Sequence, residues 1–193
     1  LLHIVKIVNE TQHLSNVGVT FGDPEFDIPK IRSHKNKIIS QLNGGISQLA
    51  KARNVNVLCG KASFINNSEV VVETSEKKEQ IQFKNCIIAS GSTAATLPNL
   101  PLDHPLVLTS KTALDLDDIP GCLLIIGGGI IGLELGQVYS TLGTDVSVVE
   151  YMPSLIPGAD DDIAKPLIRK LKKHFKRTLV QLEKITKQQK GSS

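Results

Sequence analysis

The stretch Leu123-Leu-Ile-Ile-Gly-Gly-Gly-Ile-Ile-Gly132 decides the fold of this 193-residue chain. Its four leading apolar residues are typical of a buried strand, and the glycines that follow have a GxGxxG spacing. Residues 133–142 are compatible with a helix, and residues 145–150 form a second strand pattern that ends in an acid. A strand, a glycine turn, a helix and a strand in this order predict a βαβ unit of the kind that holds dinucleotides.

Each glycine of the turn has a physical task in such a unit. Gly127 permits the tight change of direction from strand to helix, and Gly129 lets the backbone approach a pyrophosphate closely because it has no Cβ. Gly132 lets the helix pack against the strand, and Gly136 extends this packing by one turn. The free N–H groups at the start of the helix would then face the phosphates.

The acid at the end of the second strand indicates which dinucleotide is bound. Glu150 lies 18 residues after Gly132, close to the spacing expected of a carboxylate that accepts hydrogen bonds from a ribose. A carboxylate repels a 2′-phosphate, and Tyr151-Met-Pro153 supplies no arginine to offset that repulsion. The sequence therefore predicts NAD rather than NADP. The alternatives are a glycine turn that binds nothing and a turn that faces a flavin dinucleotide.

Composition excludes several other classes of function. The net charge is only +3, so nothing global indicates nucleic acid, and we interpret the basic residues of 165–177 as a solvated helix face. No apolar run approaches the length of a membrane span and the start does not resemble a signal peptide, so we expect a cytoplasmic protein or an internal piece of one. The five histidines and three cysteines have no metal-ligand spacing, and we expect the cysteines to be buried and inert.

The remaining sequence predicts further helices and strands of an α/β fold. Residues 1–14 are expected to form a helix, and Asp27-Ile-Pro29 to start a second one. That second helix would turn six apolar side chains toward a core, namely Ile31, Ile38, Ile39, Leu42, Ile46 and Leu49. Strands are expected at 54–60, 69–73 and 81–83, with a hairpin loop over 74–80.

Further elements are expected on both sides of the glycine turn. Residues 86–89 should form a short strand buried on both faces, 161–176 a basic helix and 178–186 another strand. We place the domain boundary near 118–121. The chain would then divide into residues 1–118, residues 119–187 and a mobile tail at 188–193.

Several segments together resemble one enzyme family. Ile125-Ile-Gly-Gly-Gly-Ile-Ile-Gly-Leu-Glu-Leu-Gly136, followed by Asp145-Val-Ser-Val-Val-Glu150, is similar to the NAD-binding half of dihydrolipoyl dehydrogenase, a flavoprotein of the pyridine nucleotide-disulfide oxidoreductases. Cys86-Ile-Ile-Ala-Ser-Gly-Ser92 resembles the turn that closes the FAD domain of this family, and Gly60-Lys-Ala-Ser-Phe64 resembles a segment beside the FAD adenine. Leu1-Leu2-His3 resembles the helix after the redox disulfide.

The resemblance implies roles for individual residues. Gly127, Gly128, Gly129, Ile131 and Gly132 would belong to the NAD phosphate turn, and Glu150 would bind the adenosine ribose. Ile130 and Glu134 match positions near the nicotinamide. Flavin-side positions are matched by Ala62, Ser90, Gly91 and Ser92. The resemblance also implies two Rossmann-like units, both incomplete: residues 1–118 would be the remainder of an FAD-binding domain and residues 119–187 the first part of an NAD-binding domain. For the full-length relatives, it implies FAD, a homodimer and binding to other subunits of 2-oxo-acid dehydrogenase complexes.

Other parts of the family pattern have no match in this sequence. The CxxxxC disulfide, the FAD-binding glycine turn and the C-terminal His–Glu pair are not found, so we assign no catalytic residue and expect this chain alone to be inactive. It would then be an internal or truncated portion of such an enzyme. Two alternatives stay open: a non-catalytic remnant that binds NAD or another protein, and a sister disulfide reductase such as glutathione or mercuric reductase.

Overall fold

The computed structural model describes residues 1–98 and 100–181, which divide into two compact units. Unit 1 contains residues 1–32 together with the described residues from 96 onward, and unit 2 contains residues 33–95. Both units mix helices and strands, as an α/β fold requires. The assignment of residues 1–118 and 119–187 to FAD- and NAD-binding domains stays a prediction, and the expected tail at 188–193 lies outside the described residues.

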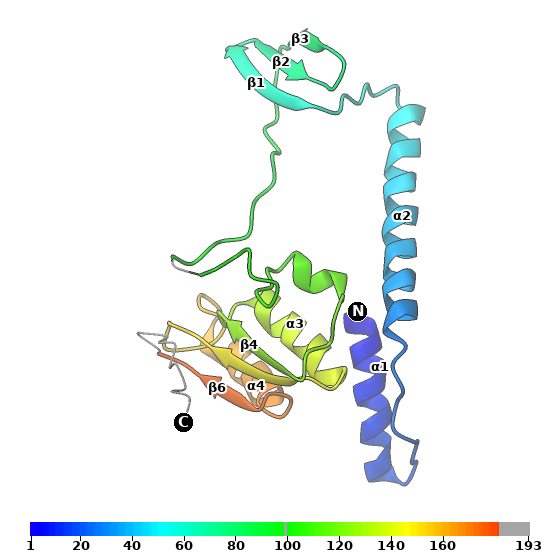
Figure 1. Ribbon diagram of the computed structural model, residues 1–193, viewed down its shortest axis with the longest axis vertical. Helices are drawn as coiled ribbons and strands as arrows, with labels where there is room; N and C mark the ends of the chain where they lie inside the picture. Colours follow the sequence, from blue (N-terminus) through cyan, green and yellow to red (C-terminus); the bar gives the residue numbers. More distant parts are fainter. Residues whose placement is uncertain (99, 182–193) are drawn as a thin grey trace. The chain divides into compact units, whose positions relative to one another are not determined.

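Unit 1 is built on the predicted βαβ unit. The strand β4 (Cys122–Ile126) leads into helix α3 (Ile130–Thr141) and then into β5 (Asp145–Val149). A second crossover through α4 (Asp161–Leu171) leads to β6 (Arg177–Leu179). The three strands are parallel in the order β4-β5-β6, as Figure 1 shows around the labelled α3 and α4. This arrangement confirms the strand–turn–helix–strand prediction.

The core of unit 1 lies between this sheet and its helices. Val146 and Val148 of β5 are almost completely buried, and they share a face of the sheet with Leu123 and Ile125 of β4. On the helix side the core contains Leu133, Val138 and Tyr139 of α3, Leu171 of α4 and Phe175. The opposite face of β4 carries Leu124 and Ile126, which are exposed, so β4 is only half-buried rather than buried on both faces.

The N-terminal helix completes this unit. Helix α1 (Leu2–His13) confirms the helix predicted at 1–14, and Figure 1 shows it beside α3, which it contacts. A 3-10 turn, η1 (Leu14–Val17), follows it. A second one, η2 (Thr112–Asp115), presents the Ala113 carbonyl to the Tyr139 hydroxyl, which donates a 2.9 Å hydrogen bond. Burial raises the pKa of Tyr139, and nearby aspartates add to the effect.

Unit 2 contains most of helix α2 (Ile28–Ala52) and an antiparallel meander. The helix begins where the sequence predicts, because the Asp27 carboxylate accepts the Lys30 N–H at 3.0 Å and caps its start. This hydrogen bond lowers the pKa of Asp27. The meander consists of β1 (Lys61–Asn66), β2 (Glu69–Glu73) and β3 (Lys78–Gln82), paired in that order. The strand at 69–73 is confirmed, and the predicted loop at 74–80 is shorter because β3 begins at Lys78.

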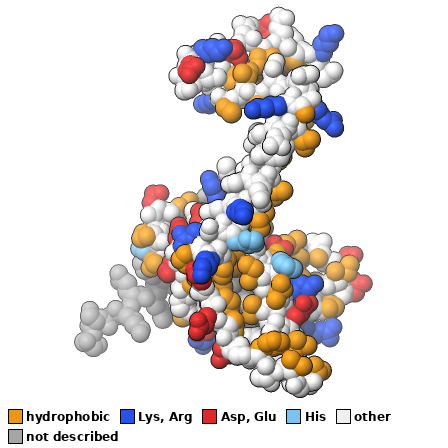
Figure 2. All heavy atoms as spheres, turned by 90° about the vertical axis from the view of Figure 1, so that its right-hand side faces the viewer, with side chains coloured by type: hydrophobic (Ala, Val, Ile, Leu, Met, Phe, Trp, Pro, Cys, Tyr) orange, Lys and Arg blue, Asp and Glu red, His pale blue; other side chains and the backbone are white. Residues whose placement is uncertain are grey.

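The prediction that the apolar face of α2 packs against a core is wrong for most of the helix. Only Ile31 packs against a buried core, whereas the five other side chains predicted to do so are exposed, namely Ile38, Ile39, Leu42, Ile46 and Leu49. No residue of α2 is buried. Figure 2 shows hydrophobic side chains also at the surface of the β1–β3 meander, between charged ones. Phe64 and Ile65 of β1 are both exposed.

Two predicted strands do not form. Residues 55–59 and 86–89 are irregular, and Ile87 and Ile88 are 91% and 73% exposed, so the second segment is neither a strand nor buried. The first run alternates like a strand and the second is wholly apolar. A strand exists only where a neighbour pairs with it, and no described residue pairs with either run. The helix predicted at 161–176 ends at Leu171, and of the strand at 178–186 the structure describes β6 and the residues to 181.

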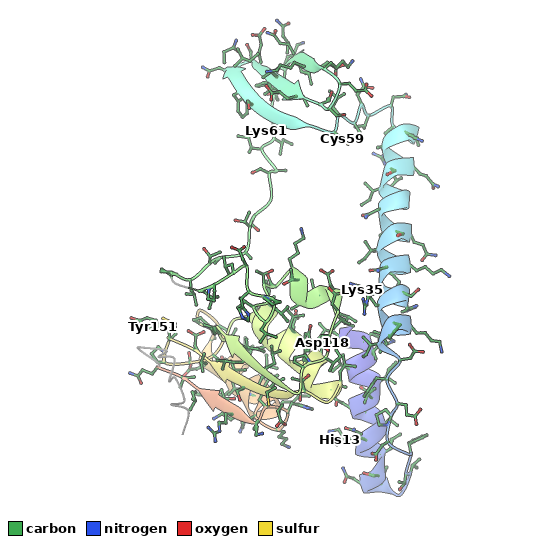
Figure 3. The ribbon with its side chains drawn as sticks, in the orientation of Figure 1. His13, Lys35, Cys59, Lys61, Asp118 and Tyr151 are labelled. Atoms are coloured by element: carbon green, nitrogen blue, oxygen red, sulfur yellow. The ribbon has the colours of Figure 1, made fainter. Side chains whose placement is uncertain are left out.

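The cysteines are not buried either. Cys59, Cys86 and Cys122 are all free and exposed, which corrects the expectation of buried thiols. Cys59, labelled in Figure 3, lies just before β1, and Cys86 lies in the irregular run 86–89. Because the strand patterns around Cys59 and Cys86 remain unpaired, no sheet buries their side chains.

Candidate dinucleotide-binding site

The glycine turn joins the end of β4 to the start of α3. Gly127 has φ +108°, a left-handed conformation that favours glycine, and its N–H donates a 2.8 Å hydrogen bond to the Val149 carbonyl of β5. Gly129 is the N-cap residue of α3 and carries no capping side chain. The first N–H groups of α3 therefore face the turn without a side-chain partner from the cap, as an anion-binding helix start requires.

The other glycines allow close packing, as the sequence predicts. A Cβ on Gly132 would lie 2.8 Å from the Gly127 carbonyl oxygen and 3.0 Å from Ile125 Cγ2. A Cβ on Gly136 would lie 2.9 Å from Ile125 Cδ1 and 3.0 Å from Phe175 Cζ. Gly129 differs from both, because nothing lies within 4 Å of the place where its Cβ would be. The space beside Gly132 is thus filled by protein atoms, whereas the space beside Gly129 is open.

Glu150 lies against this turn. It is the residue after β5 and is only 8% exposed. Its Oε2 accepts the Gly128 N–H at 2.5 Å, and its Oε1 accepts the Met152 N–H at 2.7 Å. A carboxylate has about four acceptor sites, and these two N–H groups occupy two of them. The structure therefore brings together the two features that the sequence separates by 18 residues, the glycine turn and the acid.

A loop that the sequence reasoning overlooked packs over the same turn. The Leu155 side chain is 2% exposed, and a Cβ on Gly128 would lie only 2.4 Å from Leu155 Cδ2. The Ile156 N–H donates a 2.9 Å hydrogen bond to the Gly128 carbonyl. Tyr151 projects to the surface at the start of the loop, where Figure 3 labels it. The signal for this contact was the pair of aliphatic residues Leu155-Ile156 between two prolines in the segment that follows the acid.

The other predicted site residues fall into two groups. Ile130, Ile131 and Glu134 lie on the first turns of α3, exposed to solvent near the glycine turn. Ala62 lies in β1, and Ser90, Gly91 and Ser92 form an exposed irregular turn in which Gly91 has φ +73°. This second group belongs to unit 2, whereas the glycine turn and Glu150 belong to unit 1. Their cofactor roles stay predictions.

The electrostatics around α4 agree with a solvated basic face. Burial lowers the pKa of His174, and the positive charges of Lys170, His13 and Lys173 lower it further. Lys176 forms an exposed ion pair with Asp145, which raises the pKa of Lys176. Among the described residues, no group of three or more His, Cys, Asp or Glu side chains is placed to hold a metal ion.

These features define a class of protein, a βαβ dinucleotide-binding fold with an acid at the end of its second strand. The family model for pyridine nucleotide-disulphide oxidoreductases matches residues 4–192. The chain belongs to this family. The α/β fold expected from the sequence is confirmed, and none of the described helices is long and apolar enough to cross a membrane.

Individual relatives make the comparison more specific. The chain is 44% identical to a dihydrolipoyl dehydrogenase of Vibrio parahaemolyticus over 176 residues, which are 91% of this chain and 37% of the relative. It is 35% identical to that of Bacillus subtilis over 173 residues, or 89% of this chain and 38% of the relative. The resemblance to this enzyme is confirmed, and the chain spans less than two-fifths of these relatives.

Solved structures agree with this result. A flavoprotein disulfide reductase of Escherichia coli, RclA, matches with a TM-score of 0.71 and 26% identity, covering 93% of this chain and 39% of that chain. LpdA of Mycobacterium tuberculosis matches with a TM-score of 0.76 and 18% identity, covering 93% of this chain and 40% of that chain. The latter likeness concerns the fold alone.

Proposed function

We propose that residues 122–150 bind NAD, with its diphosphate at the glycine turn and its adenosine ribose on Glu150. The observation that carries this proposal is the position of the Glu150 carboxylate, which is fixed at 2.5 Å from the Gly128 N–H at the start of the turn. Beside it, Gly129 leaves open space where any other residue would place a side chain. An anionic diphosphate fits the uncapped N-terminus of α3.

The same carboxylate supports NAD over NADP. Two backbone N–H groups hold Glu150, and its remaining acceptor sites suit the two hydroxyls of a ribose. A 2′-phosphate in the same place would meet a negative charge that is almost buried, where screening by water is weak. Tyr151, Met152 and Pro153 offer no cation to offset it. This argument disfavours a reductase that uses NADPH.

When bound, NAD supplies a nicotinamide ring that accepts or donates hydride. The part of this chain is to bind and orient the coenzyme. Ile130 and Glu134 are four residues apart and therefore share one face of α3, exposed beside the turn. We assign them to the nicotinamide side, as the resemblance to dihydrolipoyl dehydrogenase suggests.

Calorimetric titration tests the binding site. The unaltered chain should bind NAD saturably and NADP at least about tenfold more weakly, a difference of about 1.4 kcal/mol. Gly129→Val should abolish NAD binding, because its side chain fills the open position. Gly22→Val is the matched control, since Gly22 also has open space around it but lies far along the chain from the turn. No heat at millimolar NAD would identify the chain as a remnant that does not bind nucleotide.

The activity of the longer relatives is a separate proposal. We infer that this chain is a portion of a dihydrolipoyl dehydrogenase-like flavoprotein, in which a homodimer and FAD complete the path from dihydrolipoamide to NAD. None of its three cysteines forms a CxxxxC pair, so the chain by itself should not exchange electrons with dihydrolipoamide. Steady turnover of dihydrolipoamide by the purified chain with NAD and FAD would refute this inference.

A further inference from the structure

The loop that follows Glu150 is fastened to the glycine turn at several points. The Glu150 carboxylate joins the Gly128 and Met152 N–H groups, and the Ile156 N–H returns to the Gly128 carbonyl. The Leu155 side chain is buried in the core of unit 1 and lies directly against Gly128. Residues 150–156 therefore form a loop whose first and last residues are both hydrogen-bonded to Gly128. We call this loop the clamp.

The clamp explains why position 128 is a glycine. Any side chain there would meet Leu155 Cδ2 at 2.4 Å and Glu150 Cβ and Oε2 at 3.2 Å. Gly128 is buried, whereas its neighbour Gly129 is exposed and opens to empty space. The two adjacent glycines thus have different tasks, because Gly129 leaves room for a ligand while Gly128 leaves room for Leu155.

The loop is also held in an unfavourable backbone conformation. Ile156 has φ +56°, a left-handed value that a β-branched residue adopts only at a cost. Such a conformation persists where its surroundings impose it, here the hydrogen bond to Gly128 and the buried neighbour Leu155. If Leu155 no longer anchored the loop, Ile156 would relax and the Met152 N–H would move away from Glu150.

We propose that Leu155 and Ile156 are positioning residues, which hold the Glu150 carboxylate and the Gly128 peptide in the geometry that takes the adenosine ribose. This inference rests on the proposed binding of NAD. Neither side chain needs to touch the coenzyme, because each acts through Glu150 and the turn. Selectivity for NAD over NADP depends on a fixed carboxylate, so it depends on the clamp formed by residues 150–156.

Leu155→Ala in the 193-residue chain tests the clamp, with Leu171→Ala as the matched control. Leu171 is as deeply buried, at 1% exposed, and belongs to the same core, but it lies at the end of α4. Leu155→Ala should raise the Kd for NAD by about tenfold, which corresponds to the loss of one hydrogen bond to a charged group. It should also reduce the preference for NAD, measured as the Kd for NADP divided by the Kd for NAD. Leu171→Ala should leave the Kd for NAD and the preference for NAD within about twofold of the values for the unaltered chain.

Amide hydrogen exchange, measured by NMR without coenzyme, gives an independent readout. In Leu155→Ala the Gly128, Met152 and Ile156 N–H groups should exchange faster relative to the core of β5, and in Leu171→Ala they should not. Leu155→Met keeps the side-chain volume and should restore both affinity and protection. If Leu155→Ala does not fold, the milder Leu155→Val should show the same effects in reduced form.

The outcomes separate the two proposals. If the unaltered chain binds no NAD, the proposed function fails, while selective loss of amide protection still supports the clamp. Unchanged protection, or a Kd for NAD and a preference for NAD that respond equally to Leu155→Ala and Leu171→Ala, would overturn the clamp even if NAD binding is confirmed.

Discussion

Valine substitutions at Gly129 and Gly132, two glycines of one turn, should distinguish an effect on NAD binding from an effect on the stability of the fold. A Cβ on Gly132 would lie 2.8 Å from the Gly127 carbonyl oxygen, whereas a Cβ on Gly129 would meet nothing within 4 Å. We expect Gly132→Val to destabilise unit 1 strongly while Gly129→Val mainly removes NAD binding. The two variants add the same atoms three residues apart, so composition cannot explain a difference between them.

The size of the effect follows from what each side chain meets. At Gly132 the nearest atom is a backbone oxygen that cannot move without opening the turn, so the upper end of the overpacking range, roughly 2–3 kcal/mol, is expected. The better helix propensity of valine than of glycine returns only a few tenths. At Gly129, loss of a glycine N-cap costs about 1 kcal/mol or less.

Urea unfolding followed by tyrosine fluorescence provides the assay. The chain has no tryptophan, and both of its tyrosines, Tyr139 and Tyr151, belong to unit 1, so their signal reports on that unit alone. The midpoint should fall by about 1 M for Gly132→Val and by clearly less for Gly129→Val. If Gly132→Val is as stable as Gly129→Val, the close contact between α3 and the turn is not what the structure indicates.

Three further changes test other parts of unit 1 and the exposed run 86–89 of unit 2. Tyr139→Phe should cost about 1–2 kcal/mol in urea unfolding, because it leaves the buried Ala113 carbonyl without its 2.9 Å donor; a neutral result would contradict that role. Burial holds the pKa of His174 below 6.5 in the folded chain. As the pH falls through 6.5, His174 is therefore protonated in the unfolded chain before it is protonated in the folded chain, and the folded chain should lose stability. Melting at about pH 7.5 and about pH 5.5 should show a smaller acid-induced loss for His174→Gln, and an equal loss would reject the assignment. Ile87→Lys should raise the solubility of the chain, since Ile87 is 91% exposed beside Ile88. Light scattering that does not change would contradict aggregation through this exposed apolar pair.

The predictions that succeeded depended on local patterns. The order of apolar run, glycine turn, helix pattern and strand pattern predicted β4, α3 and β5, because neighbouring elements of a βαβ unit pack on one another. Asp27 marked the start of α2 through a hydrogen bond that spans only three residues. The roles of Gly127 and Gly132 also followed from spacing, since both concern contacts within the turn.

The predictions that failed depended on partners far along the chain. The run 86–89 has the composition of a buried strand, yet Ile87 and Ile88 are exposed because no described strand lies beside them. The apolar side chains of α2 have helical spacing, and spacing cannot say whether another element covers them. The exposed cysteines Cys59 and Cys86 are a consequence of the same unpaired segments.

The sequence by itself determined that a dinucleotide-type turn exists and which acid accompanies it, because these properties follow from residue types at fixed spacing. Only the tertiary structure decided how they combine: that Glu150 faces the Gly128 N–H, and that Leu155 occupies the space beside Gly128. The reason is physical. A turn is specified by the local backbone, whereas the contact between residues 128 and 155 requires β4 and β5 to lie side by side in the sheet.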